Sequence, residues 1–600
     1  MEYIIVQAGG KGTRLGYLTK NKPKALLPVE NLPMLFHLFR KYPDKRFIII
    51  ADYQKEVLRE YLSAFAQVKY LVVDAEGTGT CAGIRQAVAL IPERESFMLI
   101  WSDLILPEDF HLPAEYGGKA VRCSEEDELA VWSVGDKAAG QPEEDELAVQ
   151  SVEDKAAERS EKVEVAVRTG EDKATRRSEE EDAAYGGKSE VQNGPEHDYI
   201  GISTTFPCRW SYVDGEFVEK SSCENGVAGF FLFTDKSKLQ KVPASGELVR
   251  WMQREGKCYR EISLAGTKEF GLLEEYLRLT KEKCRPFNRI TVEGDILVKE
   301  AVDPQGAALA ERECLWYEKA RQLPGFRPCE KEQAERQDAG IYEQINTRTE
   351  SRILPTVYGK NPLRMEYIRG KNLYECSLDR EGKKQVLSRV ISALNRLHQA
   401  EQVPADSFSI KEAYYRKTMD RLSKIEDLVP FARDREIMIN GKKCKNVFFH
   451  KRELEKKLEE LTCDTFCFLH GDCTFSNLML REDETPVLID PRGYFGFTDF
   501  YGDIRYDWAK LYYSIVGNYD RFNLKEFRLD IGEEGVRLEI ASSHWEDMEE
   551  EFFALTGAVP GEIRLLHAVI WLSLTTYAWQ DYDSVCGAFY NGLYYLEDVL

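Results

Sequence analysis

Residues 3–15 read YIIVQAGGKGTRL, an apolar run that leads directly into a glycine-rich loop. The apolar run predicts a buried strand. The glycines of the loop let backbone N–H groups approach phosphate oxygens with no side chain in the way. A wholly apolar run follows at 47–50, and further strands are predicted at 68–73 and 96–101, with a helical pattern over 54–65. This alternation predicts a parallel sheet whose ligands lie at the carboxyl ends of its strands.

A second stretch with the residues of phosphate chemistry lies near the other end, where residues 469–490 read LHGDCTFSNLMLREDETPVLID. Asp472 precedes Asn477 by five residues, which is the spacing of a kinase catalytic loop. Asp490 closes the apolar run 487–489, where a metal-binding carboxylate is expected. Both stretches in one chain indicate two consecutive reactions: phosphorylation of a small molecule, then attachment of a nucleotide to that phosphate.

Length and composition limit the class of protein. The 600 residues exceed what one core usually organises, so two or more domains are expected. The net charge of −22 argues against a nucleic-acid partner. The 14 cysteines form no CxxC pair, and no apolar stretch reaches the ~20 residues that span a membrane. With no signal-peptide pattern at the N-terminus, we expect a cytoplasmic protein with no membrane partner.

The domain organisation follows from a change of composition. EEDELAVWSVGDKAA recurs as EEDELAVQSVEDKAA within an acidic, repetitive segment, which we interpret as an insertion over 121–197. A strand at 226–233 and an amphipathic helix at 268–281 are predicted beyond it. We place a domain boundary at 284–287, which gives an N-terminal domain over 1–283 and a second domain over 284–600.

The N-terminal residues fit nucleotidyl transfer. Arg14 and Lys24 follow the glycine loop, and Asp103 ends a predicted strand. This chemistry needs cations to neutralise the triphosphate and the attacking phosphate, and a carboxylate to hold Mg²⁺. The local basic run at 20–24, KNKPK, is also expected to face nucleotide phosphates.

With these residues in place, the N-terminal half resembles the sugar-phosphate nucleotidyltransferases, which include cytidylyltransferases for phosphocholine. Their loop has the form (A/G)-G-x-G-T-R-L, followed by P-K-x-L-(L/V)-P, and residues 8–15 and 23–28 match these motifs. By this resemblance Arg14 and Lys24 act on the phosphates and Asp103 binds the metal. The resemblance further implies nucleotide contacts at Ala8, Gly9, Gly10, Gly12, Thr13, Gly79 and Thr80, and acceptor contacts at Glu219 and Lys220.

One departure from this family concerns the metal. Many members that act on sugars carry a second metal-binding Asp two residues before a late Gly-Thr. Here Gly266-Thr267 is preceded by Leu264-Ala265. Either another carboxylate substitutes, or the second metal contact is made differently.

The C-terminal half resembles the aminoglycoside phosphotransferase and choline kinase family. The resemblance rests on H-G-D-x-x-x-x-N at 470–477, on 365–368 as the interdomain hinge and on the L-x-x-L-H helix at 394–398. It implies that Asp472 accepts the substrate proton, while Asn477 and Asp490 hold Mg²⁺. It further implies ATP contacts at Lys299, Glu313, Glu366 and Ile368, with Glu311 as an alternative to Glu313. Arg492 is expected to meet an anionic group of the substrate or to form a structural salt bridge.

The sequence thus predicts an α/β protein, with a Rossmann-like three-layer N-terminal nucleotidyltransferase domain and a bilobal kinase-like C-terminal domain. Its expected function is to phosphorylate a small sugar or amino alcohol with ATP and couple the product to a second NTP, CTP or UTP, with Mg²⁺. The product would be an NDP-activated precursor for surface polysaccharide or lipid decoration. The alternative is that the kinase-like half is a non-catalytic binding or assembly module. The sequence leaves the oligomeric state open.

Overall fold

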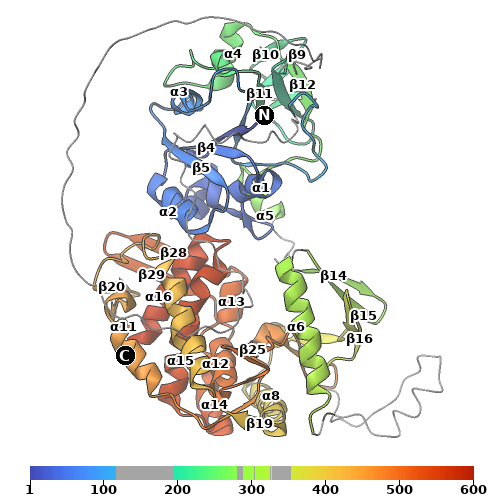
Figure 1. Cartoon of the computed structure of the whole chain (residues 1–600), viewed down its shortest axis with the longest axis vertical. Coiled ribbons are helices and arrows are strands. Elements are labelled where there is room, and N and C mark those ends of the chain that lie inside the picture. The colour runs from blue at the N-terminus through green and yellow to red at the C-terminus, as the bar shows by residue number, and fades with distance from the viewer. Residues whose placement is uncertain (117–194, 280–287, 303, 325, 327–352) are drawn as a thin grey trace, which may run out of the picture.

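A computed structural model describes residues 1–116, 195–279, 288–302, 304–324, 326 and 353–600 of the chain. Residues 121–194 of the predicted insertion and the predicted boundary at 284–287 lie outside this part of the chain. Figure 1 shows an N-terminal domain of helices and strands above a mainly helical lobe, with a small sheet and one long helix beside that lobe. The mixture of helices and strands confirms the predicted α/β class.

The N-terminal domain is built on a sheet whose central strands run parallel in the order β5-β4-β1-β6. These strands are β1 (Tyr3–Gln7), β4 (Arg46–Ala51), β5 (Lys69–Asp74) and β6 (Phe97–Trp101), and β11 (Gly226–Phe233) joins β6 in antiparallel. All lie close to the predicted strands, because short segments made mostly of apolar residues suit a sheet with helices on both faces. The domain also contains β2 (Pro28–Val29), β3 (Leu32–Pro33), β8 (Tyr199–Ser203), β9 (Ser211–Val213), β10 (Glu216–Val218) and β12 (Arg260–Ser263).

Helices cover both faces of this sheet. Along β1, Ile4 and Val6 belong to one apolar cluster, while Tyr3 and Ile5 belong to another, because successive side chains of a strand point to opposite faces. Helices α1 (Met34–Lys41) and α2 (Lys55–Phe65) pack on the first face. Helices α3 (Ile84–Ala89) and α4 (Leu248–Glu255) pack on the second. The predicted three-layer arrangement is confirmed.

The helix predicted over 268–281 is wrong in its first part. Lys268–Glu269 form strand β13, which pairs with β7 (Leu104–Ile105), and helix α5 begins only at Leu273 and ends at Leu279. The backbone N–H of Phe270 donates to the carbonyl of Asp103 at 3.2 Å. Pairing with a distant strand therefore overrides the local helical pattern, and it brings residue 269 next to Asp103.

The C-terminal domain has two lobes, as predicted. The small lobe is a sheet in the order β14-β15-β17-β16, packed against α6 (Pro304–Ala320). Its strands are β14 (Asn288–Glu293), β15 (Ile296–Ala301), β16 (Val357–Lys360) and β17 (Leu363–Glu366). Residues 367–369 then lead into β18 (Gly370–Asn372), which pairs with β23 (Leu478–Arg481) of the large lobe.

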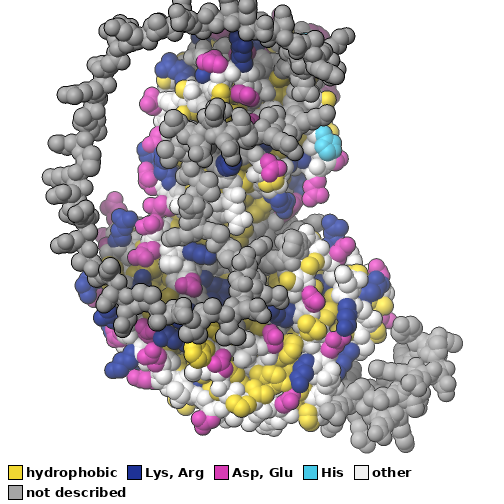
Figure 2. Space-filling view, viewed as in Figure 1, with side chains coloured by type: hydrophobic (Ala, Val, Ile, Leu, Met, Phe, Trp, Pro, Cys, Tyr) yellow, Lys and Arg dark blue, Asp and Glu magenta, His cyan; other side chains and the backbone are white. Residues whose placement is uncertain are grey.

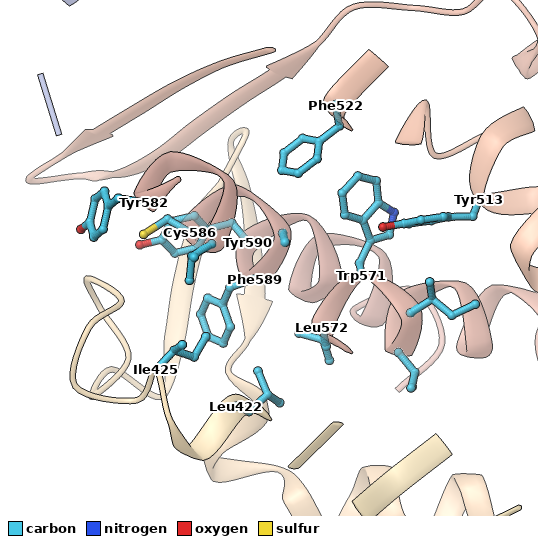
Figure 3. Packing of buried hydrophobic residues seen from close by; sticks show 14 of the residues in the cluster. Leu422, Ile425, Tyr513, Phe522, Trp571, Leu572, Tyr582, Cys586, Phe589 and Tyr590 are labelled. Carbon is cyan, nitrogen blue, oxygen red and sulfur yellow. The ribbon is translucent and has the colours of Figure 1, made fainter. Parts of the chain in front are cut away.

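The large lobe is mainly helical. Figure 3 shows Trp571 of α15 (Pro560–Leu574) between Tyr513 of α12 (Ile504–Ile515) and Phe522 of α13 (Tyr519–Asn523), with ring centroids 4.7 and 5.0 Å from that of the tryptophan. The other helices are α8 (Arg380–Ala400), α9 (Ser407–Lys411), α10 (Lys417–Ser423), α11 (Lys451–Glu459), α14 (Glu549–Thr556) and α16 (Tyr582–Leu596). The remaining strands are β19 (Gln402–Pro404), β20 (Glu436–Ile439), β21 (Lys442–Lys445), β22 (Thr465–Phe468), β24 (Pro486–Leu488), β25 (Tyr494–Phe495), β26 (Thr498–Asp499), β27 (Tyr501–Gly502), β28 (Phe527–Gly532) and β29 (Gly535–Ile540).

The large lobe also binds the basic loop of the N-terminal domain. Lys22 Nζ donates to Asp581 Oδ1 and to Asp583 Oδ2, each at 2.7 Å, and the lysine side chain is 4% exposed. Lys20 pairs with Asp530 of β28. The expectation that the whole basic run faces nucleotide phosphates is therefore wrong for Lys20 and Lys22. Their partners lie more than 500 residues away in the sequence, where no local pattern reveals them.

Aromatic contacts extend this interface. The ring of Trp579 lies 5.4 Å from that of Phe36 and 5.9 Å from that of Phe65. Burial alone would lower the pKa of Lys22, but the charges of Asp581 and Asp583 outweigh it and raise that pKa. The cation is therefore held charged at the domain interface, where losing it would leave two carboxylates buried without their partner.

Figure 2 shows basic and acidic side chains interspersed over the described surface of one face of the molecule. Within the described residues, the longest apolar helices fall short of what crossing a lipid bilayer requires.

Two candidate active sites

The glycine loop bends sharply after β1. Gly12 has a φ of +63°, and a Cβ there would lie 3.3 Å from the Cβ of Lys24. A Cβ on Gly9 would lie 2.8 Å from the Cβ of Asp52. These two positions favour glycine, because one has left-handed backbone and the other is too close to a neighbouring strand end. The loop therefore exposes backbone at the carboxyl end of β1, where Ala8, Gly10 and Thr13 also lie.

Lys24 and Asp103 form an ion pair beside this loop. The Nζ of Lys24 also lies 3.9 Å from Oε1 of Glu269. Burial and the nearby charge of Asp103 raise the pKa of Glu269, while the charges of Lys24 and Arg14 act in the opposite direction. The structure therefore brings Lys24, Asp103 and Glu269 together, and the charge of the exposed Arg14 also acts on Glu269.

Three charged residues of the C-terminal domain meet between its lobes. Lys299 Nζ lies 2.6 Å from Glu313 Oε2 and 2.5 Å from Asp490 Oδ1. Burial alone would lower the pKa of Lys299, but Asp490 and Glu313 outweigh it and raise that pKa. Glu311, the alternative partner, is exposed on α6. The geometry thus joins strand β15, helix α6 and the segment that follows β24.

Asp472 and Asn477 lie in contact on the loop that follows β22. Asn477 Nδ2 donates to the carbonyl of Asp472 at 2.8 Å and to its Oδ2 at 3.0 Å. Lys510 Nζ lies 2.9 Å from Asp472 Oδ1. Burial raises the pKa of Asp472, but the charge and hydrogen bond of Lys510 outweigh it, so that the pKa lies below its usual range. The carboxylate is therefore ionised at neutral pH.

A buried carboxylate from another element holds this loop in shape. Asp507 of α12 accepts the backbone N–H of His470 at 2.9 Å and that of Gly471 at 2.7 Å. Its Oδ2 also lies 2.9 Å from Nε2 of His398. The ring of His470 contacts the carbonyl of Ile489 at 3.0 Å. These contacts make His470 and Asp507 structural residues that position the loop of Asp472.

Comparison with known proteins matches a different family model in each part of the chain. Residues 4–160 match the MobA-like NTP transferase domain, and residues 301–536 match the phosphotransferase enzyme family. The chain joins a nucleotidyltransferase domain to a phosphotransferase domain. Both resemblances drawn from the sequence motifs are confirmed at this level.

Individual relatives cover only parts of this chain. Bifunctional protein GlmU of Methanocaldococcus jannaschii is 32% identical over 110 residues, which are 18% of this chain and 26% of the relative. UTP–glucose-1-phosphate uridylyltransferase AglF of Haloferax volcanii is 37% identical over 60 residues, 10% of this chain and 25% of the relative. The chain thus spans about a quarter of the length of these curated relatives. The solved gentamicin complex of APH(2″)-IIa is 15% identical, covers 53% of this chain and 95% of its own, and has a TM-score of 0.30.

The other predicted residues of the nucleotidyltransferase domain fall into two groups. Thr80 lies at the end of β1, since its carbonyl accepts from Gln7 Nε2 at 2.9 Å and its Oγ1 accepts the backbone N–H of Leu248 at 2.8 Å. The neighbouring Gly79 packs against the carbonyl of Gly246. Glu219, in contrast, is exposed and pairs with Arg209 and Arg250. Its described contacts, and those of Lys220 beside it, do not include Arg14, Lys24 or Asp103.

The predicted hinge of the phosphotransferase domain lies between the lobes. Glu366 ends β17, and its Oε1 lies 2.6 Å from Nη1 of Arg481 in β23. Ile368 is buried, and the backbone N–H of Tyr367 donates to the carbonyl of Asp295 at 2.9 Å. The Glu366–Arg481 pair therefore ties the small lobe to the large one, while the backbone bond holds the hinge to the turn between β14 and β15.

Glu269 is the residue that the sequence analysis missed. The expected second acid was sought two residues before Gly266-Thr267, but it follows that pair by two residues. The only signal in the sequence for this second acid was an acidic residue close to Gly266-Thr267, before or after the pair. The residues fit a divalent cation, because the carboxylates of Asp103 and Glu269 both lie beside Lys24 Nζ and Asp103 Oδ1 is buried without a hydrogen-bond partner among the described residues.

We expect Glu269→Gln to raise the Mg²⁺ concentration needed for half-maximal nucleotidyl transfer by about 10- to 100-fold, as loss of a supporting carboxylate does at other metal sites. Pyrophosphate release titrated against Mg²⁺ measures this. The exposed Glu261→Gln in the same domain serves as the matched control. An unchanged Mg²⁺ requirement in the Glu269 variant would exclude the residue from the metal site.

Proposed function

We propose that the chain phosphorylates the hydroxyl of a small molecule with ATP and then couples the product to a second NTP, CTP or UTP. The observation that carries this proposal is that each domain gathers its own buried cluster of opposite charges. The Lys24–Asp103 pair lies in one domain and the Lys299–Asp490 pair in the other. Both clusters match the needs of phosphate chemistry in their families.

In the first step, Asp472 accepts the proton of the substrate hydroxyl. The hydroxyl oxygen forms a bond to the γ-phosphorus of ATP, and the bond between that phosphorus and the leaving ADP breaks. Asn477 keeps the carboxylate of Asp472 oriented through the hydrogen bond described above. Lys299, held by Glu313, neutralises the phosphates of ATP.

In the second step, an oxygen of the new phosphate attacks the α-phosphorus of the NTP, and pyrophosphate leaves. Lys24 and Arg14 balance the negative charge that develops on the phosphates. The glycine loop supplies backbone N–H groups to the same phosphates. The product is an NDP-activated molecule.

Both families use nucleotides with Mg²⁺. Asp103 and Glu269 would hold the ion in the nucleotidyltransferase domain, and Asn477 and Asp490 in the phosphotransferase domain. When bound, Mg²⁺ neutralises phosphate charge that these side chains alone leave unbalanced.

The acceptor is a sugar or another small alcohol. The AglF relative is named for glucose 1-phosphate, which favours a sugar phosphate as the second substrate. A product of this kind suits surface polysaccharide or lipid decoration. The alternative of a non-catalytic C-terminal module is disfavoured, because Lys299, Asp472 and Asp490 are all kept in contact with charged or polar partners.

The test is to incubate the chain with Mg²⁺, ATP, each further NTP and a panel of sugars and alcohols, and to determine product masses. We expect an NDP-linked product only when ATP, the second NTP and a hydroxyl substrate are all present. Formation of the same product without ATP would contradict the order of steps.

A further inference from the structure

Cationic side chains from four elements gather around the rings of Tyr494 and Tyr506, beside Asp472. The ring centre of Tyr494, in β25, lies 4.6 Å from Cζ of Arg492, 4.8 Å from Cζ of Arg312 and 5.5 Å from Nζ of Lys417. Arg492 also donates to the hydroxyls of Tyr494 and Tyr506, each at 2.7 Å. The rings hold the cations in place without neutralising them.

This cluster adjoins the loop of the proposed base. The backbone N–H of Arg492 donates to the carbonyl of His470 at 2.9 Å. Lys510, which contacts Asp472, lies with its Nζ 6.0 Å from the ring centre of Tyr506. In Figure 1, β25 lies between α6 and α12, the helices that carry Arg312 and Tyr506. Asp472 and the cationic cluster therefore border the same part of the site.

Few carboxylates act on these cations: the charge of Asp472 acts on Arg492 and that of Glu412 on Lys417. Among the described residues, Arg312, Lys417 and Arg492 form no ion pair, and Asp472 is the acid that Lys510 contacts. Burial, together with the charges of Arg492, Arg421 and Lys510, lowers the pKa of Lys417, with Glu412 acting in the opposite direction. Lys417 and Arg492 are half-buried, while Arg312 is exposed. Cations that share one ring repel one another, and an anion between them would relieve that repulsion.

Most of the cluster belongs to the large lobe, where we expect the acceptor, and Arg312 reaches it from α6 of the small lobe. Lys417 and Arg421 come from α10, and Arg421 lies over Tyr577, which belongs to the helical segment at 575–578 before α16. The ATP-facing residues Lys299 and Glu313 come from the small lobe. An amino alcohol or another cation would be repelled here, whereas a carboxylate or phosphate group can bind a guanidinium through two hydrogen bonds.

We propose that the substrate of the phosphotransferase domain is itself an anion: a hydroxyl compound with a carboxylate or phosphate group, which Arg492 and Lys417 bind while Asp472 receives the hydroxyl proton. This inference rests on the proposed function and narrows its substrate class. It selects acidic sugars and hydroxy acids over amino alcohols.

The test compares matched compounds that differ in charge: glucose with glucuronate, and glycerol with glycerate, glycerol phosphate and ethanolamine. ADP formation by the full chain is measured for each. We expect kcat/KM for the best acid to exceed that for its neutral counterpart by about 10-fold or more. A neutral or cationic compound that is preferred over its acid would overturn the inference.

Lys417→Met removes one cation while keeping most of the side-chain volume, and costs no described ion pair. It should raise KM for the acid by about 10-fold with KM for ATP unchanged. Lys424→Met, at the exposed end of α10, is the matched control. A rise in KM for ATP alone would assign the cluster to ATP and overturn the inference.

Binding measurements test the anion site independently of the kinase assignment. If no compound is phosphorylated, the proposed function fails, and thermal shifts of the full chain with each compound then decide the inference. Stabilisation by glycerate, glycerol phosphate or glucuronate that Lys417→Met abolishes supports the anion site. Equal shifts with the acids and with glycerol or glucose contradict it.

Discussion

Asp472→Asn is expected to abolish formation of the NDP-linked product from the unphosphorylated substrate. The amide keeps the size of the carboxylate but cannot accept the hydroxyl proton, and it loses the charge that Lys510 contacts at 2.9 Å. Loss of a general base lowers turnover by roughly 10²- to 10⁴-fold. ADP release in the presence of the substrate measures the effect.

The same variant should make the NDP-linked product at a normal rate when the phosphorylated intermediate is supplied. Lys24 and Asp103 lie in the other domain and have no described contact with Asp472. Asp464→Asn, an exposed carboxylate of the same lobe, is the control and should behave as the wild type. Full activity of Asp472→Asn on the unphosphorylated substrate would remove the kinase assignment, and failure of the rescue would break the proposed coupling of the two steps.

A structural feature could be predicted from the sequence when the residues that determine it lie close together in the chain. The strand β1 and its glycine loop are contiguous, so their apolar run and backbone requirements are visible in one stretch of sequence. From the sequence, either Glu311 or Glu313 on α6 could pair with Lys299. A helical pattern alone does not show which side of the helix faces the sheet. Burial of one acid and exposure of the other resolve it.

Other features arise from contacts between distant segments. Glu269 comes close to Lys24, the partner of Asp103, because β13 pairs with β7, a pairing that competes with a local helical pattern. The cations around Tyr494 come from α6, α10 and the segment after β24, and each alone reads as an ordinary surface lysine or arginine. The sequence suggested an anionic partner only for Arg492, and only as one of two alternatives.

The interface between the two domains involves the basic loop of the nucleotidyltransferase domain. Lys22, two residues before Lys24, is held by Asp581 and Asp583 of the phosphotransferase domain. The loop that carries Lys24, the proposed phosphate-binding lysine, is thus anchored at one end by the other domain. Linking the domains also raises the local concentration of the shared intermediate. The Lys22 anchor has a different effect, because it fixes the position of the loop.

Lys24→Met should reduce nucleotidyl transfer by roughly 10²- to 10³-fold, the cost of removing one preorganised group that faces developing charge. The methionine keeps the packing of the buried stem, so the fold and the phosphotransferase reaction should persist. Pyrophosphate release from the NTP and the phosphorylated intermediate measures the loss, and ADP formation from the unphosphorylated substrate checks the other domain.

The loop supplies its own control for this prediction. Lys20→Met removes a lysine four positions away, whose partner Asp530 lies across the domain interface and whose side chain is 49% exposed. An exposed ion pair contributes about 0–1 kcal/mol, so this variant should keep near-normal pyrophosphate release. A similar loss in both variants would mean that the loop acts through its overall charge or its docking to the other domain. A loss confined to Lys24→Met would assign the effect to the one lysine that contacts Asp103, because the two substitutions remove the same charge from the same loop.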